Sequence, residues 1–285
     1  MRNRSWLTRF AYSVMLLPAL LITVVLFLFS LAPTFAFSVY KFVPPASMQP
    51  AFVLDNYAAF THPVYFGYIV TTARIGVIST LVAVVLAYPM AYTIARSASA
   101  RMRRVLLFSV MVMFFVHTIV RAYAWVAVLG RTGPLSSLLE LLGIGPLRLL
   151  SNEFAVTVGT IHWLLPFAVM TLIGPIQTVD PALEDAARNL GATELKTFTS
   201  VTLPLTFPGV AAASLLSLTL GFGMFVTPMI LGGGLVTMLA KFIYDETIFA
   251  NNYPVGAAGT ITLLVLATAV SVVVSRFFEA RTKVL

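Results

Sequence analysis

The sequence predicts an all-α polytopic membrane protein with six transmembrane helices, and three observations carry this prediction. Hydrophobic residues make up 59% of the 285 residues and charged residues only 10%, whereas a soluble domain carries about 25% charged residues. The mean hydropathy is +0.96, so the chain has too few charged side chains to cover a water-facing surface. Six apolar segments reach the roughly 20 residues that a helix needs to cross a bilayer.

The six predicted spans follow one another along the whole chain. They are residues 12–40, 68–95, 105–129, 154–176, 206–231 and 254–277. The first span follows Arg2, Arg4 and Arg9, as in a signal peptide, but its apolar run exceeds the roughly 7–15 residues of a signal sequence. We expect it to be retained as a span. If it were cleaved, the other five spans would keep their orientation.

The basic residues predict the orientation. With the N-terminus inside, twelve of the 18 lysines and arginines lie on the inner side, four on the outer side and two within spans. The inner ones are Arg2, Arg4, Arg9, Arg96, Arg101, Arg103, Arg104, Arg188, Lys196, Arg276, Arg281 and Lys283; the outer ones are Lys41, Arg131, Arg148 and Lys241; Arg74 and Arg121 fall within spans. Because inner loops carry the excess of basic residues, both termini are expected in the cytoplasm.

Two outer connections carry a local signal. The connection that contains Pro44, Pro45 and Pro50 is expected to be irregular. The stretch Ser136–Leu142 is apolar enough to form a short interfacial helix.

The inner connection of residues 178–206 has the pattern of two short helices. Asp180 is a suitable N-cap, and Pro181 suits the first helical position. An apolar stripe follows at helical spacing, formed by Leu183, Ala186, Ala187 and Leu190. Gly191 then permits a sharp change of direction, because glycine tolerates a positive φ. The alanines favour close approach to a groove of another protein, although a helix resting on the membrane surface has the same pattern.

The second helix of this connection is expected to start at Thr193, which is a suitable N-cap, and to run to about Ser200. Leu203-Pro204 is expected to end this helix and to lead into the next span.

The same segment resembles the signature of the permeases of ATP-binding-cassette (ABC) importers, the EAA loop. That signature reads Glu-Ala-Ala, three residues, Gly, nine residues, Ile, one residue and Leu-Pro. This chain has Asp185-Ala186-Ala187, Gly191, Val201 and Leu203-Pro204 at the same spacing. Asp185 for Glu and Val201 for Ile depart from the pattern and keep its chemistry. Glu184 stands one residue before the acidic position and is a second candidate for the acidic role.

Further motifs are similar to the spermidine/putrescine branch of these permeases. They are Ala87-Tyr88-Pro89, Arg121-Ala122-Tyr123-Ala124-Trp125, Phe225-Val226-Thr227-Pro228 and Leu231-Gly232-Gly233. The resemblance implies a type I ABC importer permease fold with residues 1–285 as one permease domain. Residues 178–206 would form its coupling loop, with a coupling helix at Asp180–Leu190. The residues it implies for ATPase coupling are Glu184, Asp185, Ala186, Ala187, Gly191, Leu203 and Pro204.

The resemblance also implies partners and a location. The partners are an ABC ATPase dimer, a second permease chain, an extracytoplasmic solute-binding protein and the lipid bilayer, with no role for nucleic acid. The location is the bacterial cytoplasmic (inner) membrane. The implied solute is a polyamine (spermidine or putrescine) or a similar small organic solute. The pairing with a related permease chain, rather than an identical one, follows from the branch that the chain resembles.

The energy for transport is expected from another chain. A phosphate-binding loop needs Gly-Lys-[Ser/Thr] after a glycine-rich turn, and no lysine of this chain follows a glycine. The run Gly232-Gly233-Gly234 is followed by Leu235 and is interpreted as a flexible outer turn. We therefore expect no enzyme activity and no bound cofactor, with ATP and Mg on the partner ATPase. Because cysteine is absent and the histidines are isolated, no metal site is expected either.

The rival hypothesis is a stand-alone ion-coupled secondary transporter or channel. Such a carrier typically has acidic residues within the bilayer. All ten acidic residues of this chain fall in predicted loops or near a terminus, which argues against it.

Several residues near the outer ends of the spans are candidates for lining the solute pathway. They are Arg121, Tyr123, Trp125, Phe225 and Thr227. Arg121 lies about 25 Å along a helix from Arg104, near the outer interface. It is either an arginine that extends to the interface beside an aromatic belt or part of an outer gate. His117 and His162 are expected to pack or to form hydrogen bonds.

Overall fold

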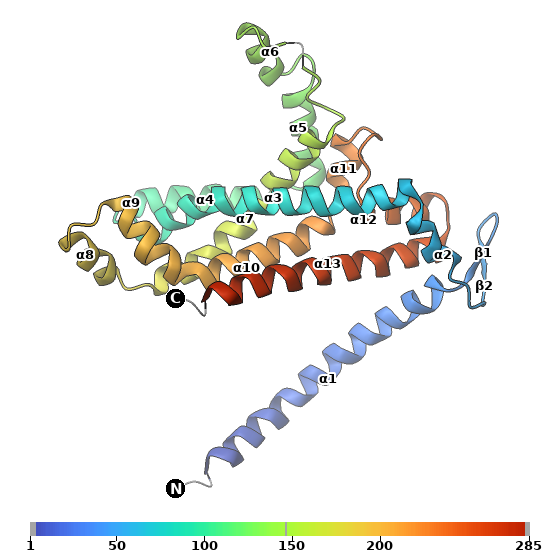
Figure 1. Ribbon diagram of the computed structural model, residues 1–285, viewed down its shortest axis with the longest axis horizontal. Helices are drawn as coiled ribbons and strands as arrows, with labels where there is room; N and C mark the ends of the chain where they lie inside the picture. The colour runs from blue at the N-terminus through green and yellow to red at the C-terminus, as the bar shows by residue number, and fades with distance from the viewer. Residues whose placement is uncertain (1–3, 146, 283–285) are drawn as a thin grey trace.

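The computed structural model describes residues 4–145 and 147–282, and of residues 4–15, 19, 281 and 282 it describes the backbone alone. Arg2 and Lys283, which were counted in the charge pattern, lie outside the described residues. The elements in chain order (Figure 1) are α1 (Arg4–Ser38), β1 (Lys41–Val43), β2 (Ser47–Gln49), α2 (Asp55–Ala58), η1 (Ala59–Thr61), α3 (Pro63–Arg96), α4 (Ala100–Phe115), α5 (Thr118–Leu129), α6 (Pro134–Leu141), α7 (Glu153–Thr178), α8 (Pro181–Asn189), α9 (Glu194–Thr197), η2 (Phe198–Thr202), α10 (Leu203–Phe222), α11 (Val226–Leu231), α12 (Leu239–Tyr244), η3 (Asp245–Phe249) and α13 (Tyr253–Thr282).

Within the described residues, five helices are long and apolar enough to cross a membrane. They are Leu16–Ser38 within α1, Pro63–Arg96, Glu153–Thr178, Glu194–Phe222 and Tyr253–Ala280. A sixth span is obtained when the bent pair Ala100–Phe115 and Thr118–Leu141 is counted as one. The predicted fold class is therefore confirmed, and five of the six predicted spans are single helices over most of their length.

The predicted span of residues 105–129 is present as this bent pair, with a break that the prediction did not include. Its two parts are bent by 101°. Val116 and His117 leave the helical conformation, with ψ values of 115° and 141°. The imidazole Nδ1 of His117 accepts a hydrogen bond from the backbone N–H of Ile119 at 3.3 Å. A polar side chain that caps a new helix lowers the cost of a break within an apolar segment.

The predicted span of residues 206–231 also differs from the structure at both ends. Its outer part is broken: α10 ends at Phe222, and α11 begins only at Val226. At its inner end the helix does not stop at Leu203-Pro204, because α9, η2 and α10 are continuous. The backbone N–H of Leu203 donates to the carbonyl of Phe198 in a wide π-turn. Pro204 follows this π-turn, in the first turn of α10.

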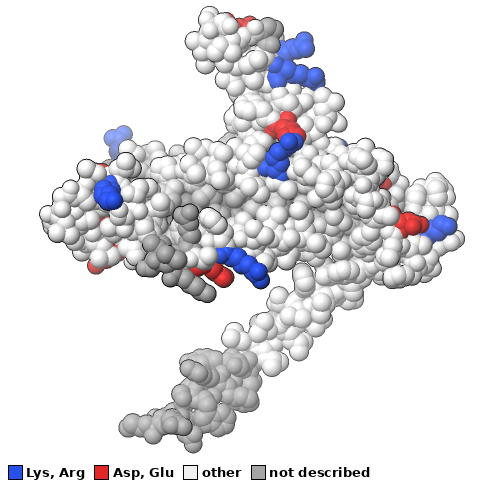
Figure 2. All heavy atoms as spheres, viewed as in Figure 1, with Lys and Arg blue, Asp and Glu red and all other residues white. Residues whose placement is uncertain are grey.

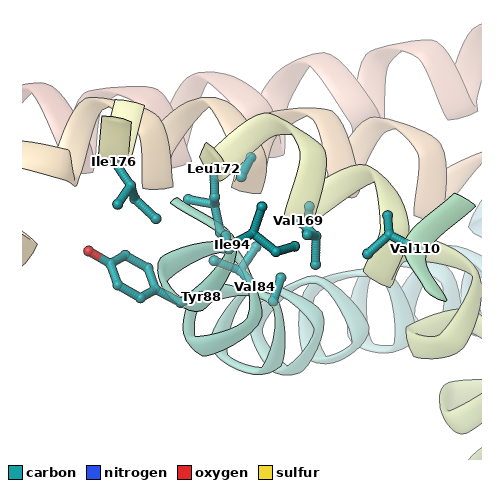
Figure 3. Close-up of a cluster of buried hydrophobic side chains, with 11 residues drawn as sticks. Val84, Tyr88, Ile94, Val110, Val169, Leu172 and Ile176 are labelled. Atoms are coloured by element: carbon teal, nitrogen blue, oxygen red, sulfur yellow. The ribbon is translucent and has the colours of Figure 1, made fainter. Parts of the chain in front are cut away.

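Four long helices, α3, α7, α10 and α13, run alongside one another and form the body of the molecule (Figure 1). Their core includes a cluster in which side chains of α3 and α7 meet, with Val110 of α4 at its edge (Figure 3). Gly76 of α3 permits a close approach to α10, because a Cβ there would lie 2.3 Å from the ring of Phe222. Small residues bring membrane helices together in this way.

The helix α1 leans away from this bundle (Figure 1), and its most apolar 18-residue window has no buried residue. The start of α1, the end of α13, and α8 and α9 all lie toward the left of Figure 1, which agrees with the predicted placement of both termini on one side. Charged side chains are few on the surface in Figure 2 and gather toward the two ends of the bundle and on the projecting α5–α6 arm.

The connections between α1 and α3 and between α11 and α13, both predicted to be outer, lie at the opposite end of the bundle (Figure 1). The proline-containing stretch is not irregular as expected: Lys41–Val43 and Ser47–Gln49 pair as an antiparallel hairpin, with Phe42 opposite Met48. The alternating residues on either side of the turn favour this pairing. The predicted short helix at Ser136–Leu142 is confirmed as α6 at the tip of the arm.

Candidate functional site

The predicted coupling helix forms as α8 and is capped as expected. The carboxylate of Asp180 accepts a hydrogen bond from the backbone N–H of Ala182 at 2.9 Å, and Pro181 is the first helical residue. The turn after the helix lies at Gly191, whose φ is +87°, and a Cβ added there would meet no other atom within 4 Å. Thr193 then caps α9 by accepting the N–H of Lys196. The helix–turn–helix pattern predicted for residues 178–206 is therefore present.

The two faces of α8 differ sharply in exposure. The predicted apolar stripe is exposed: Leu183 is 48% and Leu190 89% accessible, and Ala186 is exposed while Ala187 is half-buried. On the opposite face, the side chain of Glu184 is buried, and the residue is only 3% accessible. Leu195 of α9 adds a further exposed leucine beyond the turn, at 73%. The exposed face is thus apolar, and the face turned to the protein carries a charge.

Asp185 lies at the surface and belongs to a small ion network. The guanidinium of Arg188 contacts Asp185 at 2.8 Å and Glu194 at 2.8 Å. The hydrogen bond with Glu194, together with the charges of both carboxylates, raises the pKa of Arg188 above its usual value. Surface ion pairs of this kind contribute little to stability, but this one joins α8 to α9 across the turn at Gly191.

Leu203 and Pro204, the last residues of the predicted coupling set, lie at the start of α10. Leu203 lines an apolar cavity of about 500 Å³ between α3 and the η2–α10 segment, together with Tyr88, Tyr92 and Phe198. Leu203 therefore does not belong to the exposed face of α8. It packs against the core cluster that α3, α7 and α10 share.

The structure brings together three of the five predicted pathway residues. Arg121, Trp125 and Thr227 line one tightly packed pocket between α5, α7 and α11. The indole Nε1 of Trp125 donates to Nδ1 of His162 at 3.0 Å, so this histidine forms a hydrogen bond as expected. Tyr123 does not join the pocket and is 61% accessible. Phe225 instead stacks on Tyr244, with ring centroids 5.0 Å apart.

Arg121 does not extend to the membrane interface, and that interpretation is wrong. Its side chain folds back onto the break between α4 and α5, and the residue is 5% accessible. There its guanidinium donates to the carbonyls of Met113 and Val116, the second at 3.0 Å. The last carbonyls of a helix lack partners where its ladder is interrupted. Arg121 therefore caps the open end of α4.

Sequence reasoning missed three residues around Glu184: Tyr92, Arg96 and Thr202. Each contacts the Glu184 carboxylate. Arg96 was counted as one of many inner basic residues, and Thr202 stands at an unspecified position of the EAA signature. Their sequence distance from Glu184, up to 92 residues, left no local pattern by which to find them.

The comparisons with known proteins agree with this architecture. The family model described as "Binding-protein-dependent transport system inner membrane component" matches residues 83–284. The spermidine/putrescine transport system permease protein PotB of Escherichia coli (strain K12) is 34% identical over 221 residues, which cover 77% of this chain and 80% of PotB. The inner membrane ABC transporter permease protein YdcU of the same organism is 30% identical over 233 residues, or 77% and 74% of the two chains.

Two solved structures share the fold. A bacterial ABC transporter involved in the import of the acidic polysaccharide alginate matches with a TM-score of 0.75 and 20% identity, covering 98% of this chain and 99% of that one. The inward-facing MetNI methionine ABC transporter matches with a TM-score of 0.60 and 18% identity, covering 78% and 99%.

Proposed function

Because this chain belongs to the family of binding-protein-dependent transport system inner membrane components, we propose that α8 is the contact through which a separate ATPase drives it. The chain is a multi-pass permease subunit of a binding-protein-dependent ABC importer and is not an enzyme. It forms part of the membrane pathway, and the energy comes from another subunit that holds ATP and Mg. A stand-alone ion-coupled carrier or channel is not consistent with this family.

The observation that carries the proposal is the exposed apolar face of α8. Leu183 and Leu190 remain accessible on a short helix at the end of the bundle, beside the exposed Ala186. Exposed apolar patches rimmed by charge are typical of protein–protein contacts, and here Asp185 and Arg188 provide the rim. An amphipathic helix that enters a groove of the ATPase would bury these leucines.

The coupling role is tested first by proximity. The chain has no cysteine, so an Ala186→Cys variant carries a single thiol on α8. In the assembled transporter, a thiol cross-linker is expected to join this position to the ATPase. Leu141→Cys, on the exposed tip of α6, serves as the matched control and is expected to give no such product. Absence of the Ala186→Cys product would overturn the coupling role of α8.

The coupling role is tested second by function. Proline at position 191 cannot adopt the observed φ of +87°. Gly191→Pro should therefore abolish stimulation of the ATPase by the loaded binding protein while the protein still inserts. Gly143→Pro is a matched control, because Gly143 also has a positive φ of +73° and open surroundings but lies beyond α6. Normal stimulation in Gly191→Pro would contradict the proposal.

For the solute we propose a polyamine of the spermidine/putrescine type. The support is the similarity to PotB relatives at 34% identity over 77% of the chain. The test is uptake of labelled putrescine and spermidine into vesicles that contain the complete transporter and its binding protein. Uptake that requires ATP is expected. Uptake of neither polyamine, with ATP-dependent uptake of another small solute, would overturn the substrate and leave the permease role intact.

For the assembly we propose one related second permease, an ATPase dimer and an extracytoplasmic binding protein. In this arrangement α1 is retained as a span, and both termini, α8 and α9 are cytoplasmic. The exposed surface of α1 supports a further membrane partner or lipid around it. Labelling of single cysteines from each side of intact cells tests the orientation: a thiol on α8 is expected to react only after the membrane is permeabilised.

A further inference from the structure

The carboxylate of Glu184 is held by side chains from two other elements. Thr202 of η2 donates to Oε1 at 2.9 Å, Arg96 at the end of α3 contacts Oε1 at 3.3 Å, and Tyr92 of α3 donates to Oε2 at 3.2 Å. We call Glu184, Tyr92, Arg96 and Thr202 the Glu184 clamp. It joins α8 to α3 and to the start of the η2–α10 segment.

Burial makes the Glu184 clamp more than a surface ion pair. The Glu184 side chain is 4% and the Arg96 side chain 14% accessible. A buried carboxylate is retained only where charge and hydrogen bonds compensate for its lost water. Arg96 also donates to the carbonyl of Val179 at 2.7 Å, so that it holds the connection between α7 and α8 as well.

The backbone alone attaches α8 weakly to the bundle. Val179 and Asp180 are extended before it, and Gly191 provides a turn of positive φ after it. A helix between two such hinges can rotate without moving the spans, unless a side chain fixes it. The π-turn of η2 presents the hydroxyl of Thr202 to Glu184, and π-turns of this kind are frequent at functional sites.

We propose that Glu184 is the positioning residue through which a displacement of α8 is transmitted to α3 and α10. The inference rests on the proposed function, in which an ATPase moves α8. Phe198 packs against the ring of Tyr92 in the clamp, with ring centroids 6.5 Å apart, and α3, α7 and α10 share one core at this end. A displacement of the Glu184 carboxylate is therefore transmitted to the packed helices of the bundle.

The experiment compares Glu184→Ala with wild type in the reconstituted transporter with its ATPase and binding protein. Transport per ATP hydrolysed is expected to fall by about tenfold, a common size for coupling between two sites. The cross-link from Ala186→Cys to the ATPase should persist. Glu279→Gln, an exposed carboxylate at the same end of the bundle on α13, is the control and should keep the wild-type ratio.

A milder variant covers the case in which Glu184→Ala does not fold. Thr202→Val keeps the shape of the side chain and removes its hydrogen bond to Glu184. Transport per ATP is expected to fall by a few-fold, less than in Glu184→Ala, because Tyr92 and Arg96 still hold the carboxylate. Thr199→Val is the matched control, because Thr199 lies exposed in the same π-turn and bonds only within its own helix, to Leu195 and Lys196.

A double variant separates positioning from general destabilisation. Residues that act through one contact are not additive, so Thr202→Val added to Glu184→Ala, which leaves no acceptor for the Thr202 hydroxyl, should lower transport per ATP no further. If the two losses multiply, or if Thr202→Val leaves the ratio unchanged, the inference is overturned. If Ala186→Cys gave no cross-link to the ATPase with Glu184 and Thr202 intact, the proposed coupling role of α8 would be overturned instead. The failure of the inference and the failure of the proposed function can therefore be distinguished.

Discussion

Two regions of the molecule bury a charged side chain, and they satisfy it in opposite ways. At the inner end, Glu184 is 3% accessible and meets two hydroxyls and two arginines, Arg96 at 3.3 Å and Arg188 of its own helix at 3.9 Å. At the break between α4 and α5, Arg121 is 5% accessible and meets only backbone carbonyls. Its Nε and Nη1 atoms have no hydrogen-bond partner among the described residues.

The difference lies in how far along the chain the partners are. Arg96, Tyr92 and Thr202 stand 88, 92 and 18 residues from Glu184. Met113 and Val116 stand only 8 and 5 residues from Arg121. The first charge therefore holds separate elements together, whereas the second shapes the bend of its own segment. Burial alone does not distinguish the two roles, but the identity of the partners does.

The largest expected effect is in the Glu184 clamp, at Arg96→Met. This change removes the nearest and most buried cation and leaves the buried carboxylate with only the half-exposed Arg188, 3.9 Å away. Breaking a buried ion pair on one side costs about 3 kcal/mol, and we expect a loss of that order in the free energy of unfolding. The measurement is denaturant unfolding of the protein in mild detergent.

Arg101→Met is the control for this change. Arg101 is exposed in the first turn of α4 at the same end of the bundle, so its replacement should alter stability by less than about 0.5 kcal/mol. Equal losses in the two variants would show that the Glu184 clamp does not hold the elements together.

A smaller loss is expected at the break, from Arg121→Met. The change leaves the carbonyls of Met113 and Val116 without a donor, but it also removes two guanidinium atoms that had no partner among the described residues. The net cost should be about 2 kcal/mol, below that of Arg96→Met. Tyr123→Phe, on the exposed side of α5, is the control. A larger loss from Arg121→Met than from Arg96→Met would reverse the comparison.

The sequence predicted the long helices well, because an apolar segment of this length has few alternatives. The predicted spans 154–176 and 254–277 correspond to Glu153–Thr178 and Tyr253–Thr282. The caps at Asp180 and Thr193 were also predicted, since they depend on residues only two or three positions away.

The breaks were not predicted, because composition does not distinguish a straight apolar helix from a bent one. His117-Thr118 is a local polar signal at the first break. The burial of Glu184 was not predicted for a different reason. The pattern of α8 shows which face is apolar, whereas the face that is buried depends on Arg96 and Thr202, which come from other elements.

The smallest expected effect concerns Glu246 of η3, in the connection between α11 and α13. Burial, with the nearby charge of Asp245, raises the pKa of Glu246, against the lowering effect of the hydrogen bond from Asn252. Across the residues that the structure describes, Glu246 forms no ion pair, whereas its neighbour Asp245 pairs with Lys241. It is thus a carboxylate without a cation, as Arg121 is a guanidinium without an anion within the described part of the chain.

Glu246→Gln should therefore stabilise the protein at neutral pH, by up to about 0.5 kcal/mol. A raised pKa means that the folded state favours the protonated carboxyl. The contribution of Glu246 to the free energy of unfolding is therefore fully present below the unfolded pKa of about 4.3 and is lost as pH rises through the folded pKa. In acid the wild-type carboxyl is protonated and neutral, so the stability gained by Glu246→Gln should vanish there. Glutamine still accepts the hydrogen bond of Asn252, so this contact is the same in both proteins. Asp245→Asn, which removes the pair with Lys241, should have the opposite sign at neutral pH. Unfolding measured at neutral and acidic pH checks both variants. If Glu246→Gln destabilised the protein at neutral pH, the desolvation cost of this half-buried carboxylate would have to be offset without a counter-ion, contrary to the prediction.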